Sequence, residues 1–199
     1  MSYIGSKPAN KPVVASDIDP TIITGQTALA VAPAATDEFL VSDAGTLKRL
    51  DASLIGGANT PAFFAHSASE QALSNTTFTQ VVFGTEVLDT DSAFASNTFT
   101  VPSGEGGNYL IGANLEFSAG ANSLYGYIVD IYIDDSGYYK HNNEYEANYP
   151  SKANAPINAV IPLTAGQTVK IYGYLSYTGS AGKVFHELKT TNFYGFKLT

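Results

Sequence analysis

Apolar and polar residues alternate along the C-terminal two thirds of the chain. In residues 109–117 every odd position is apolar, and the even positions include an asparagine and a glutamate. The odd positions of residues 125–133, beginning with Tyr125, repeat the pattern, as do those of residues 157–163 and 169–175. Successive side chains of a strand point to opposite faces. The alternation therefore predicts strands with one face in a core and the other against water or a partner.

Turn-forming residues separate these segments. Residues 134–137 (Asp-Asp-Ser-Gly), 164–167 (Thr-Ala-Gly-Gln) and the glycine-rich residues 178–182 suit tight reversals of the chain. Helical periodicity is confined to single turns at residues 51–55 or 67–72. Many short strands joined by tight turns predict an all-β sandwich of antiparallel strands.

Two glycines and a proline interrupt the chain between Gly56 and Pro61. We place a domain boundary there and predict an extended N-terminal arm over residues 1–57 and a head over residues 58–199. The arm has two aromatic residues, too little apolar surface to offset the entropy of ordering it, about 1 to 2 kcal/mol per residue for the backbone. We expect sister chains or a larger assembly to hold it.

One local element is expected within the arm. Residues 38–42 and 46–50 resemble strands and flank Asp43-Ala-Gly45. They predict a small β-hairpin near residues 38–50, with the glycine in a left-handed conformation. Because an isolated two-stranded hairpin is marginally stable in water, this one needs a partner.

The charge balance argues against one class of partner. The 199 residues carry a formal net charge of −8, whereas nucleic-acid binding requires clustered lysine and arginine, so we predict no nucleic-acid partner. Cysteine is absent, which excludes disulfides and thiolate metal sites. The first residues lack the pattern of a signal peptide, and no apolar run approaches the roughly 20 residues that span a bilayer. We therefore predict synthesis in the cytoplasm and no membrane insertion.

The order of strands and turns resembles that of C1q/TNF-like jelly-roll domains. Residues 61–66 resemble the opening strand, residues 97–102 and 106–117 the Phe-Thr-x-Pro entry and the strand that follows, residues 163–169 the L-x-A-G-D-x-V turn, and residues 193–198 the closing F-x-G-x-x-L strand. Two details depart from the pattern: the Gly-x-Tyr of the long strand is stretched by one residue, and Gln167 stands where an acidic residue is common. The resemblance implies a C1q/TNF-like jelly-roll head that forms a homotrimer, since such domains generally do.

The arm resembles the N-terminal attachment segments of tailed-phage fibres and head decorations. The resemblance lies in residues 4–8, 22–29 and 33–50. It implies a phage capsid or tail protein as a partner, and a final location in the virion. The side chains expected to make the attachment are Tyr3, Ile4, Ile22, Ile23, Leu29, Phe39, Val41, Leu47 and Leu50.

Ten of the thirteen tyrosines lie between Tyr125 and Tyr177. Aromatic rings with polar tips suit protein interfaces, and they also stack on sugars. We favour contacts between subunits of the trimer, with recognition of a host surface polysaccharide as the alternative. The outward and loop tyrosines expected to form the trimer interface or a binding surface are Tyr132, Tyr138, Tyr139, Tyr145, Tyr149, Tyr172 and Tyr174.

Residues with catalytic or metal-binding potential are scattered. His66, His141 and His186 show no metal-ligand spacing, and the sequence has no Gly-x-Ser-x-Gly nucleophile motif. We predict that the protein is not an enzyme and holds no cofactor. The alternative is a calcium ion bound by acidic oxygen ligands, although adjacent loop acids are more often turn residues. The candidate ligands are Glu105, Asp130, Asp134 and Asp135.

The two resemblances together predict a structural phage protein, either a capsid decoration or head fibre or a tail fibre. The trimer would be anchored to the particle by its arm and would project the head. The alternative is a receptor-binding adhesin that recognises a host cell-surface glycan through its tyrosine-rich loops.

Overall fold

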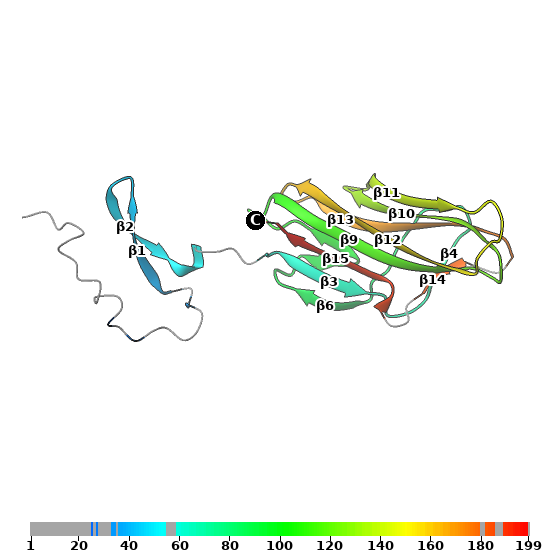
Figure 1. Ribbon diagram of the computed structural model, residues 1–199, viewed down its shortest axis with the longest axis horizontal. Coiled ribbons are helices and arrows are strands. Elements are labelled where there is room, and N and C mark those ends of the chain that lie inside the picture. Colours follow the sequence, from blue (N-terminus) through cyan, green and yellow to red (C-terminus); the bar gives the residue numbers. More distant parts are fainter. Residues whose placement is uncertain are drawn as a thin grey trace, which may run out of the picture. The chain divides into compact units, whose positions relative to one another are not determined.

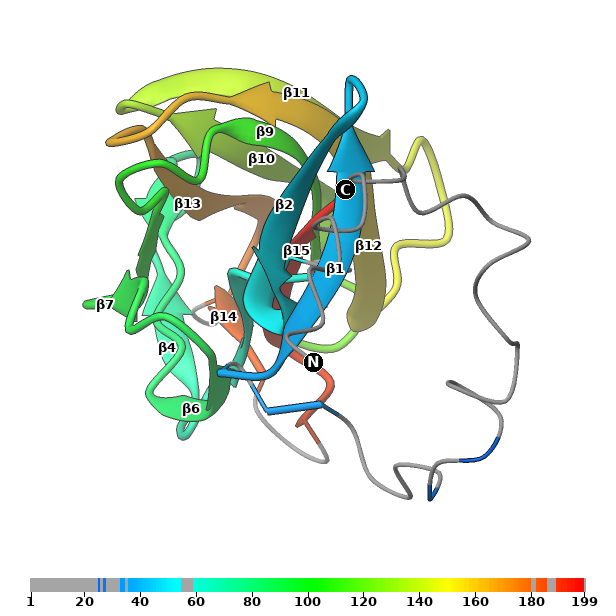
Figure 2. The ribbon, with the colours of Figure 1, turned by 90° about the vertical axis from the view of Figure 1, so that its left-hand side faces the viewer.

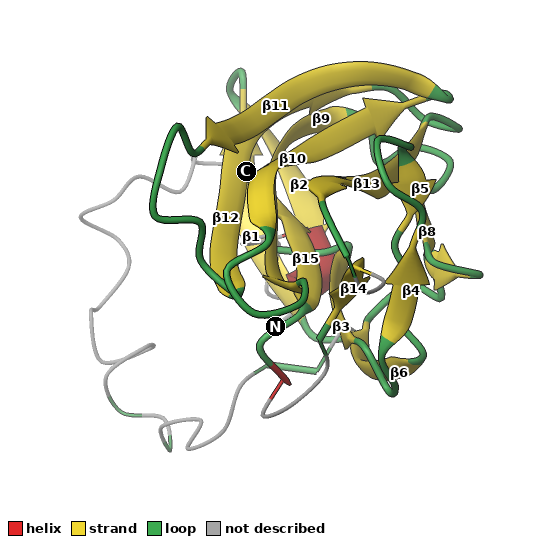
Figure 3. Cartoon of the chain, turned by 90° about the vertical axis from the view of Figure 1, so that its right-hand side faces the viewer, coloured by secondary structure: helices red, strands yellow, loops and turns green. Residues whose placement is uncertain are grey.

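The computed structural model describes residues 25, 27, 33–34, 36–54, 59–179, 182–185 and 189–198 (Figure 1). The chain forms two compact units, Met1–Gly56 and Gly57–Thr199. The described residues form strands, turns and loops, apart from short 3₁₀ turns such as Ala52–Leu54 (Figure 3). The all-β class expected from the alternation is confirmed.

The first unit contains a two-stranded antiparallel hairpin. Strand β1 (Glu38–Asp43) pairs with β2 (Thr46–Asp51), and Ala44 and Gly45 form the turn between them. Both turn residues have positive φ, 49° and 82°, as a two-residue turn that matches strand twist requires. Glycine adopts such a φ without steric cost. The hairpin expected near residues 38–50 is confirmed.

The larger sheet of the second unit is built around its longest strands. Strand β9 lies between β12 on one side and β15 on the other, and β15 continues to β3 and β6. Strand β14 pairs with the last two residues of β9 and with β4. All these pairs are antiparallel. The strands are β3 (Ala62–His66), β4 (Gln71–Leu73), β6 (Thr85–Asp89), β9 (Gly107–Ser118), β12 (Lys152–Leu163), β14 (Gly182–Val184) and β15 (Asn192–Lys197).

The second sheet runs in the order β11, β10, β13, β8 and β7, and β5 also pairs with β13. In both sheets strands far apart in sequence lie side by side, such as β10 beside β13 and β3 beside β15 (Figure 1). This exchange of strands between two layers is the jelly-roll arrangement. The strands are β5 (Thr79–Gln80), β7 (Phe94–Ala95), β8 (Thr98–Thr100), β10 (Leu124–Ile133), β11 (Ser136–Glu144) and β13 (Thr168–Tyr177).

The core lies between the two layers, which an end-on view separates (Figure 2). Phe63 stacks on Phe99 with ring centroids 4.6 Å apart, and the edge of Phe193 meets Phe63 at 4.8 Å. These rings come from strands β3, β8 and β15, and all are buried. Aromatic packing of this kind adds about 0.5 to 1.5 kcal/mol per pair beyond the burial of apolar area.

The alternation predicted most inward residues correctly. The odd positions of residues 109–117 are buried, as are those of residues 169–175. Tyr125 is the exception, because the register of β10 shifts between Leu124 and Gly126, and Tyr125 is exposed instead of facing the core. A bulge of this kind changes the face to which a side chain points.

Candidate functional site

The outer face of the larger sheet carries a continuous set of apolar side chains. In one cross-strand row, Val160, Leu110 and Phe196 lie side by side on β12, β9 and β15. In the next row Tyr194 lies beside Phe64, which faces Leu88 of β6. Val160 is 60% exposed and Leu88 47%, and the others are half-buried. We call these six residues the apolar face.

A glycine shapes the centre of the apolar face. Gly112 of β9 lies opposite Tyr194 in the register, and the tyrosine ring covers it so closely that a Cβ at position 112 would lie 2.4 Å from Tyr194 Cζ. No side chain fits there while the ring keeps its place. The ring therefore lies flat across the sheet, where it widens the apolar surface.

Charged side chains near the apolar face are paired within the chain. Lys152 pairs with Glu116 at 3.2 Å, and Lys197 pairs with Glu105 at 2.8 Å. The amide of Asn114 donates to the carbonyl of Thr190. The Oδ1 atom of Asn114 is buried without a partner among the described residues, and Asn158 of β12, which lies beside Gly112, is exposed.

The opposite outer face, on β11, β10 and β13, has a different chemistry. Asp130 of β10 lies between Lys140 of β11 and Tyr172 of β13 in one cross-strand row. Its carboxylate is fully buried, 3.4 Å from the Lys140 ammonium. Tyr172 stacks on Tyr132 at a centroid distance of 4.0 Å. Burial raises the pKa of Asp130 above its ordinary value, and Lys140 offsets only part of this rise.

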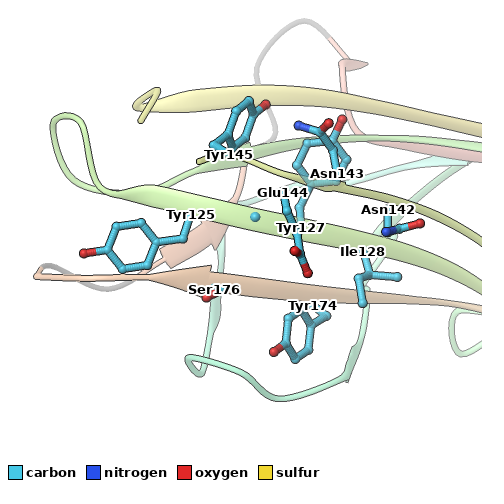
Figure 4. Close-up of a pocket in the computed structure, with 10 residues that line it drawn as sticks. Tyr125, Tyr127, Ile128, Asn142, Asn143, Glu144, Tyr145, Tyr174 and Ser176 are labelled. Atoms are coloured by element: carbon cyan, nitrogen blue, oxygen red, sulfur yellow. The ribbon is translucent and has the colours of Figure 1, made fainter. Parts of the chain in front are cut away.

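A hollow of about 350 Å³ opens at one end of this second face (Figure 4). Gly126 and Ile128 of β10 belong to its lining, together with Tyr125, Tyr174 and Glu144. A Cβ on Gly126 would lie 2.9 Å from the carbonyl oxygen of Asn143. The close approach of β11 therefore requires glycine at position 126, within the lining of the hollow.

The polar groups of this hollow have no internal partners. Within the described part of the chain, the side chains of Tyr125, Asn142, Glu144, Tyr174 and Ser176 make no hydrogen bond or ion pair. They supply hydroxyl, amide and carboxylate groups within one concave site. A ligand with several hydroxyl groups could satisfy them.

The tyrosine rings of the hollow are held in place by other rings. Tyr174 packs against Phe78 at 5.0 Å, and the Tyr125 ring meets Tyr149 edge-on at 4.5 Å. Tyr145 lies near Tyr127, whose pKa burial raises. The walls are thus fixed before any ligand arrives, which lowers the entropic cost of binding.

A second, more open hollow of about 410 Å³ lies where the edge strands β11 and β12 approach each other. Its lining includes Tyr139 and Pro156, and the Nδ1 atom of His141 lies 2.5 Å from the carbonyl oxygen of Pro156. That contact ties the edges of the two sheets together. We interpret this hollow as part of the joint between layers.

The acidic residues considered for calcium have protein partners. Asp134 and Asp135 form the turn between β10 and β11 with φ values of 49° and 63°. Asp134 accepts hydrogen bonds from Thr168 and Gln167, which lower its pKa, and Asp135 pairs with Lys170. Asp130 and Glu105 pair with lysines, as described above. Among the described residues, no three His, Asp or Glu side chains form a group that could hold a metal ion.

Gln167 connects two turns of the head. Its Oε1 accepts from the backbone of Thr164 at 2.9 Å, which closes its own turn, and its Nε2 donates to Asp134 at 2.9 Å. A carboxylate at position 167 could not donate and would repel Asp134. The departure from the C1q/TNF-like sequence pattern at this position therefore has a local explanation.

The histidines do not form a site in the described part of the chain. His66 lies on β3 with Nδ1 3.0 Å from the carbonyl oxygen of Ser67, and His141 contacts Pro156. His186 lies outside the described residues. The two described histidines thus belong to opposite sheets and serve local contacts.

The seven tyrosines predicted to form contacts divide into groups. Tyr132 and Tyr172 form the stack over Asp130, while Tyr145 and Tyr174 line the hollow. Three others lie apart from these pairs: Tyr138 is exposed, Tyr139 belongs to the joint between β11 and β12, and Tyr149 supports Tyr125. The structure brings two of the seven into one concave site.

The attachment residues can be located only in part. Phe39 and Leu47 are 40% and 70% exposed, and Val41 and Leu50 are half-buried on the same hairpin. Ion pairs between its strands, Lys48 with Asp43 and Arg49 with Glu38, hold the hairpin together. The remaining predicted attachment residues, Tyr3, Ile4, Ile22, Ile23 and Leu29, lie outside the described residues.

Sequence reasoning missed the apolar face and one wall of the hollow. Its signal was present: Leu110 and Val160 are apolar at positions where the alternation expects polar residues, and two aromatic residues flank Gly195. Tyr125 was not selected as a surface residue because the regular alternation directs it into the core. A register shift leaves no such signal in a single sequence.

Comparisons with known proteins identify the fold. No known protein family matches the sequence, and no curated protein matches it. Among solved structures, the globular domain of zebrafish complement 1qA is similar with a TM-score of 0.51 and 14% identity, covering 70% of this chain and 98% of that one. Murine APRIL is similar with a TM-score of 0.50 and 13% identity, covering 69% and 98%.

These likenesses confirm that the second unit has a C1q/TNF-like jelly-roll fold. At 13 to 14% identity they define the fold and leave the function to the residues of this chain. No helix in the described part of the chain is long and apolar enough to cross a membrane.

Proposed function

We propose that this chain is a structural protein of a phage particle, a capsid decoration or head fibre or a tail fibre. It acts as a homotrimer, and its N-terminal arm anchors it to a capsid or tail protein while the jelly-roll head projects. The observation that carries the proposal is the apolar face, which a single chain leaves in contact with water.

The apolar face suits a contact with further copies of the chain. Contiguous exposed apolar surface on a soluble protein marks an interaction site. Phe196, Tyr194 and Phe64 supply the aromatic rings that are enriched at the centres of interfaces, and neighbouring charges are already paired. The C1q/TNF-like sequence resemblance implies a homotrimer, and closed threefold symmetry would bury a shared surface of this kind on all copies.

The hairpin supports the anchoring role of the arm. Phe39, Leu40, Leu47 and Leu54 expose 40 to 75% of their surface, and the unit offers no core in its described part that would cover them. Two strands alone are marginally stable. A partner that buries these side chains would stabilise the hairpin, and the sequence resemblance of the arm makes a phage capsid or tail protein the candidate.

The proposal assigns the protein no catalytic step, no cofactor and no nucleic-acid partner. The groups examined for chemistry take part in turns, ion pairs or joints between strands. Their roles are structural, which agrees with a protein that works by contact.

Two measurements test the proposal. Native mass spectrometry of the purified full chain is expected to give the mass of three copies, and a stable monomer would overturn the trimer. Proteomic analysis of virions of the phage that encodes the chain is expected to detect it in the particle. Its absence from extensively purified virions would overturn the structural role.

The second candidate function is that of a receptor-binding adhesin for a host cell-surface glycan. The observation that favours it is the hollow beside Gly126, where polar groups without partners and aromatic rings converge. The two functions are compatible, because the hollow and the apolar face lie on different sheets.

A further inference from the structure

We infer that the hollow beside Gly126 is a saccharide subsite that takes one or two neutral sugar units of a larger glycan. The inference deepens the adhesin function and gives it a location and a ligand class. It does not depend on the trimer. It follows from the shape of the hollow, from its polar groups, which make no hydrogen bond within the described part of the chain, and from its charge.

The shape fits a small, flat ligand. At about 350 Å³, the volume lies near the lower end of the range for ligand sites, about 300 to 1,000 Å³. Gly126 and Ile128 belong to the lining of the hollow, together with Tyr125 and Tyr174, which come from the neighbouring strands β10 and β13 (Figure 4). Each of these rings is supported by another aromatic ring. A sugar ring can place its C–H groups against such rings, as apolar ligand surface does.

The polar groups match a ligand that both donates and accepts hydrogen bonds. Glu144 offers a carboxylate, Asn142 an amide, and Ser176 a hydroxyl, all without side-chain partners in the described part of the chain. Sugar hydroxyls donate to the carboxylate and also accept from the amide and hydroxyl groups. Hydrogen bonds to a charged group are the stronger kind, so Glu144 is expected to contribute most to affinity.

The charge of the hollow selects against acidic sugars. Glu144 is an unpaired carboxylate, and the lysine on the same face of β11, Lys140, lies two outward positions away and is already paired with Asp130 at 3.4 Å. A uronic or sialic acid would bring a second carboxylate next to Glu144 without a cation to balance it. Neutral hexoses, pentoses and N-acetylhexosamines avoid this repulsion.

The hollow stays accessible in the proposed trimer. It lies on the outer face of β11, β10 and β13, whereas the apolar face belongs to β12, β9, β15, β3 and β6. These are the two opposite outer faces of one sandwich. Copies that bury the apolar face would therefore present three hollows, and multivalent binding would raise the affinity for a repetitive glycan.

The full chain is tested on a printed array of oligosaccharides with neutral hexose, pentose and N-acetylhexosamine members, and with uronate- and sialate-containing members. Binding of at least one neutral member is expected, and its affinity is then measured by calorimetric titration. Two variants probe the hollow: Glu144→Gln, which keeps the shape, and Tyr125→Ala, which removes one wall. Each is expected to weaken binding about tenfold or more.

Matched variants outside the hollow serve as controls. Glu86→Gln changes an exposed acid on the other sheet, and Tyr138→Ala removes an exposed tyrosine that does not line the hollow. Both are expected to bind as the parent does. Thermal unfolding and native mass are recorded for every variant, and Glu144→Gln, a solvent-exposed isosteric change, keeps the test valid should Tyr125→Ala fail to fold.

Several outcomes would overturn the inference. They are the absence of binding to any neutral glycan, a preference for acidic glycans, or equal losses in the control and hollow variants. The trimer is judged from the same samples by mass. If the chain is a trimer but binds no sugar, the saccharide subsite is refuted and the trimer stands. If the chain is a monomer that binds a neutral sugar, the trimer is refuted and the subsite stands.

Discussion

The two outer faces of the head both consist of the outward positions of alternating strands, and they differ in the side chains that stand there. On the larger sheet, the outward positions of β9, β12 and β15 carry Leu110, Val160 and Phe196, and nearby charges are paired. On the smaller sheet, the outward positions carry tyrosines, a buried carboxylate and a hollow with free polar groups. One face leaves apolar side chains without cover, and the other carries exposed polar groups that make no bond within the described part of the chain.

This difference teaches that one sandwich can present two kinds of binding surface. Apolar surface gains free energy from burial against a partner of complementary shape, about 25 cal/mol per Å² removed from water. Free polar groups gain little from such burial and bind a ligand that completes their hydrogen bonds. We therefore assign subunit contacts to the first face and ligand binding to the second.

The strongest test of the difference between the two faces is to place a charge on the apolar face. Val160→Asp is expected to weaken trimer association about a hundredfold or more, because association would bury three unpaired carboxylates. Native mass and sedimentation at several concentrations would measure the change. Tyr138→Asp is the matched control, since Tyr138 is 56% exposed against 60% for Val160. Equal dissociation of both variants would contradict the assignment of the apolar face.

A smaller effect is expected when a methyl group is added beneath Tyr194. Gly112→Ala would place Cβ 2.4 Å from Tyr194 Cζ, so we expect a loss of about 1 to 3 kcal/mol in the free energy of unfolding. Denaturant titration would measure it. Adding Tyr194→Ala to the same chain is expected to relieve the clash, and a double-mutant cycle without coupling would contradict the contact.

Gly106→Ala is the control for this change. A Cβ at position 106 would have its nearest neighbour at 3.5 Å, an ordinary contact distance. We expect its effect on unfolding to be well below that of Gly112→Ala. A comparable loss at both positions would indicate a general cost of replacing glycine, independent of the contact with Tyr194.

The outer face on β11, β10 and β13 can be tested through the pH dependence of the stability that Asp130 contributes. Its pKa is raised in the folded protein by burial, so the folded state binds a proton more readily than the unfolded chain. The stability from this group is fully present at low pH and is lost as pH rises through the folded-state pKa. Asp130→Asn is therefore expected to raise the thermal midpoint by a few degrees near neutral pH, and the difference should shrink towards about pH 4.

If the thermal midpoints of Asp130→Asn and the parent differ by the same amount at both pH values, the raised pKa of Asp130 is contradicted. Glu86→Gln, at an exposed position, is expected to change the midpoint little at either pH. Lys140→Met provides the opposite test, because it removes the only cation paired with Asp130 in the described part of the chain. It should lower the midpoint near neutral pH and have less effect in acid.

The smallest expected effect concerns the arm. If the apolar face holds the trimer by itself, removal of residues 1–57 should leave a trimer with an unchanged thermal midpoint, to within about 1 °C. The truncated chain should no longer attach to the particle. A monomeric product would mean that the arm contributes to trimer contacts and would weaken the contrast between the two faces.

The inner half of the head could be predicted from the sequence because burial imposes a period of two on each strand. Residues such as Ile111, Leu115 and Ile171 follow that rule without exception. The rule fails at Tyr125, where a register shift turns the side chain outward. The shift depends on how β10 pairs with β13, and at the shift this pairing joins residues about fifty positions apart, such as Gly126 and Ser176, so local sequence carries no sign of it.

The outward-facing residues were harder to predict, because alternation shows which positions face outward but does not restrict which residue types stand there. The tyrosines were recognised as unusual, but their division between a stack over Asp130 and a hollow over Gly126 depends on cross-strand neighbours. The apolar face depends on the same kind of information. Leu110, Val160 and Phe196 are distant in sequence and form one surface only through the order of β12, β9 and β15.

The contact between Gly112 and Tyr194 links two positions of the chain that are more than eighty residues apart. A Cβ at position 112 would overlap the end of the Tyr194 ring, so a larger residue there requires this ring to move or to be lost. Among chains that descend from a common ancestor with this one, the two positions should vary as a pair. A relative that has lost both would have lost the ring at the centre of this sheet, and its copies would have to assemble through a differently shaped surface.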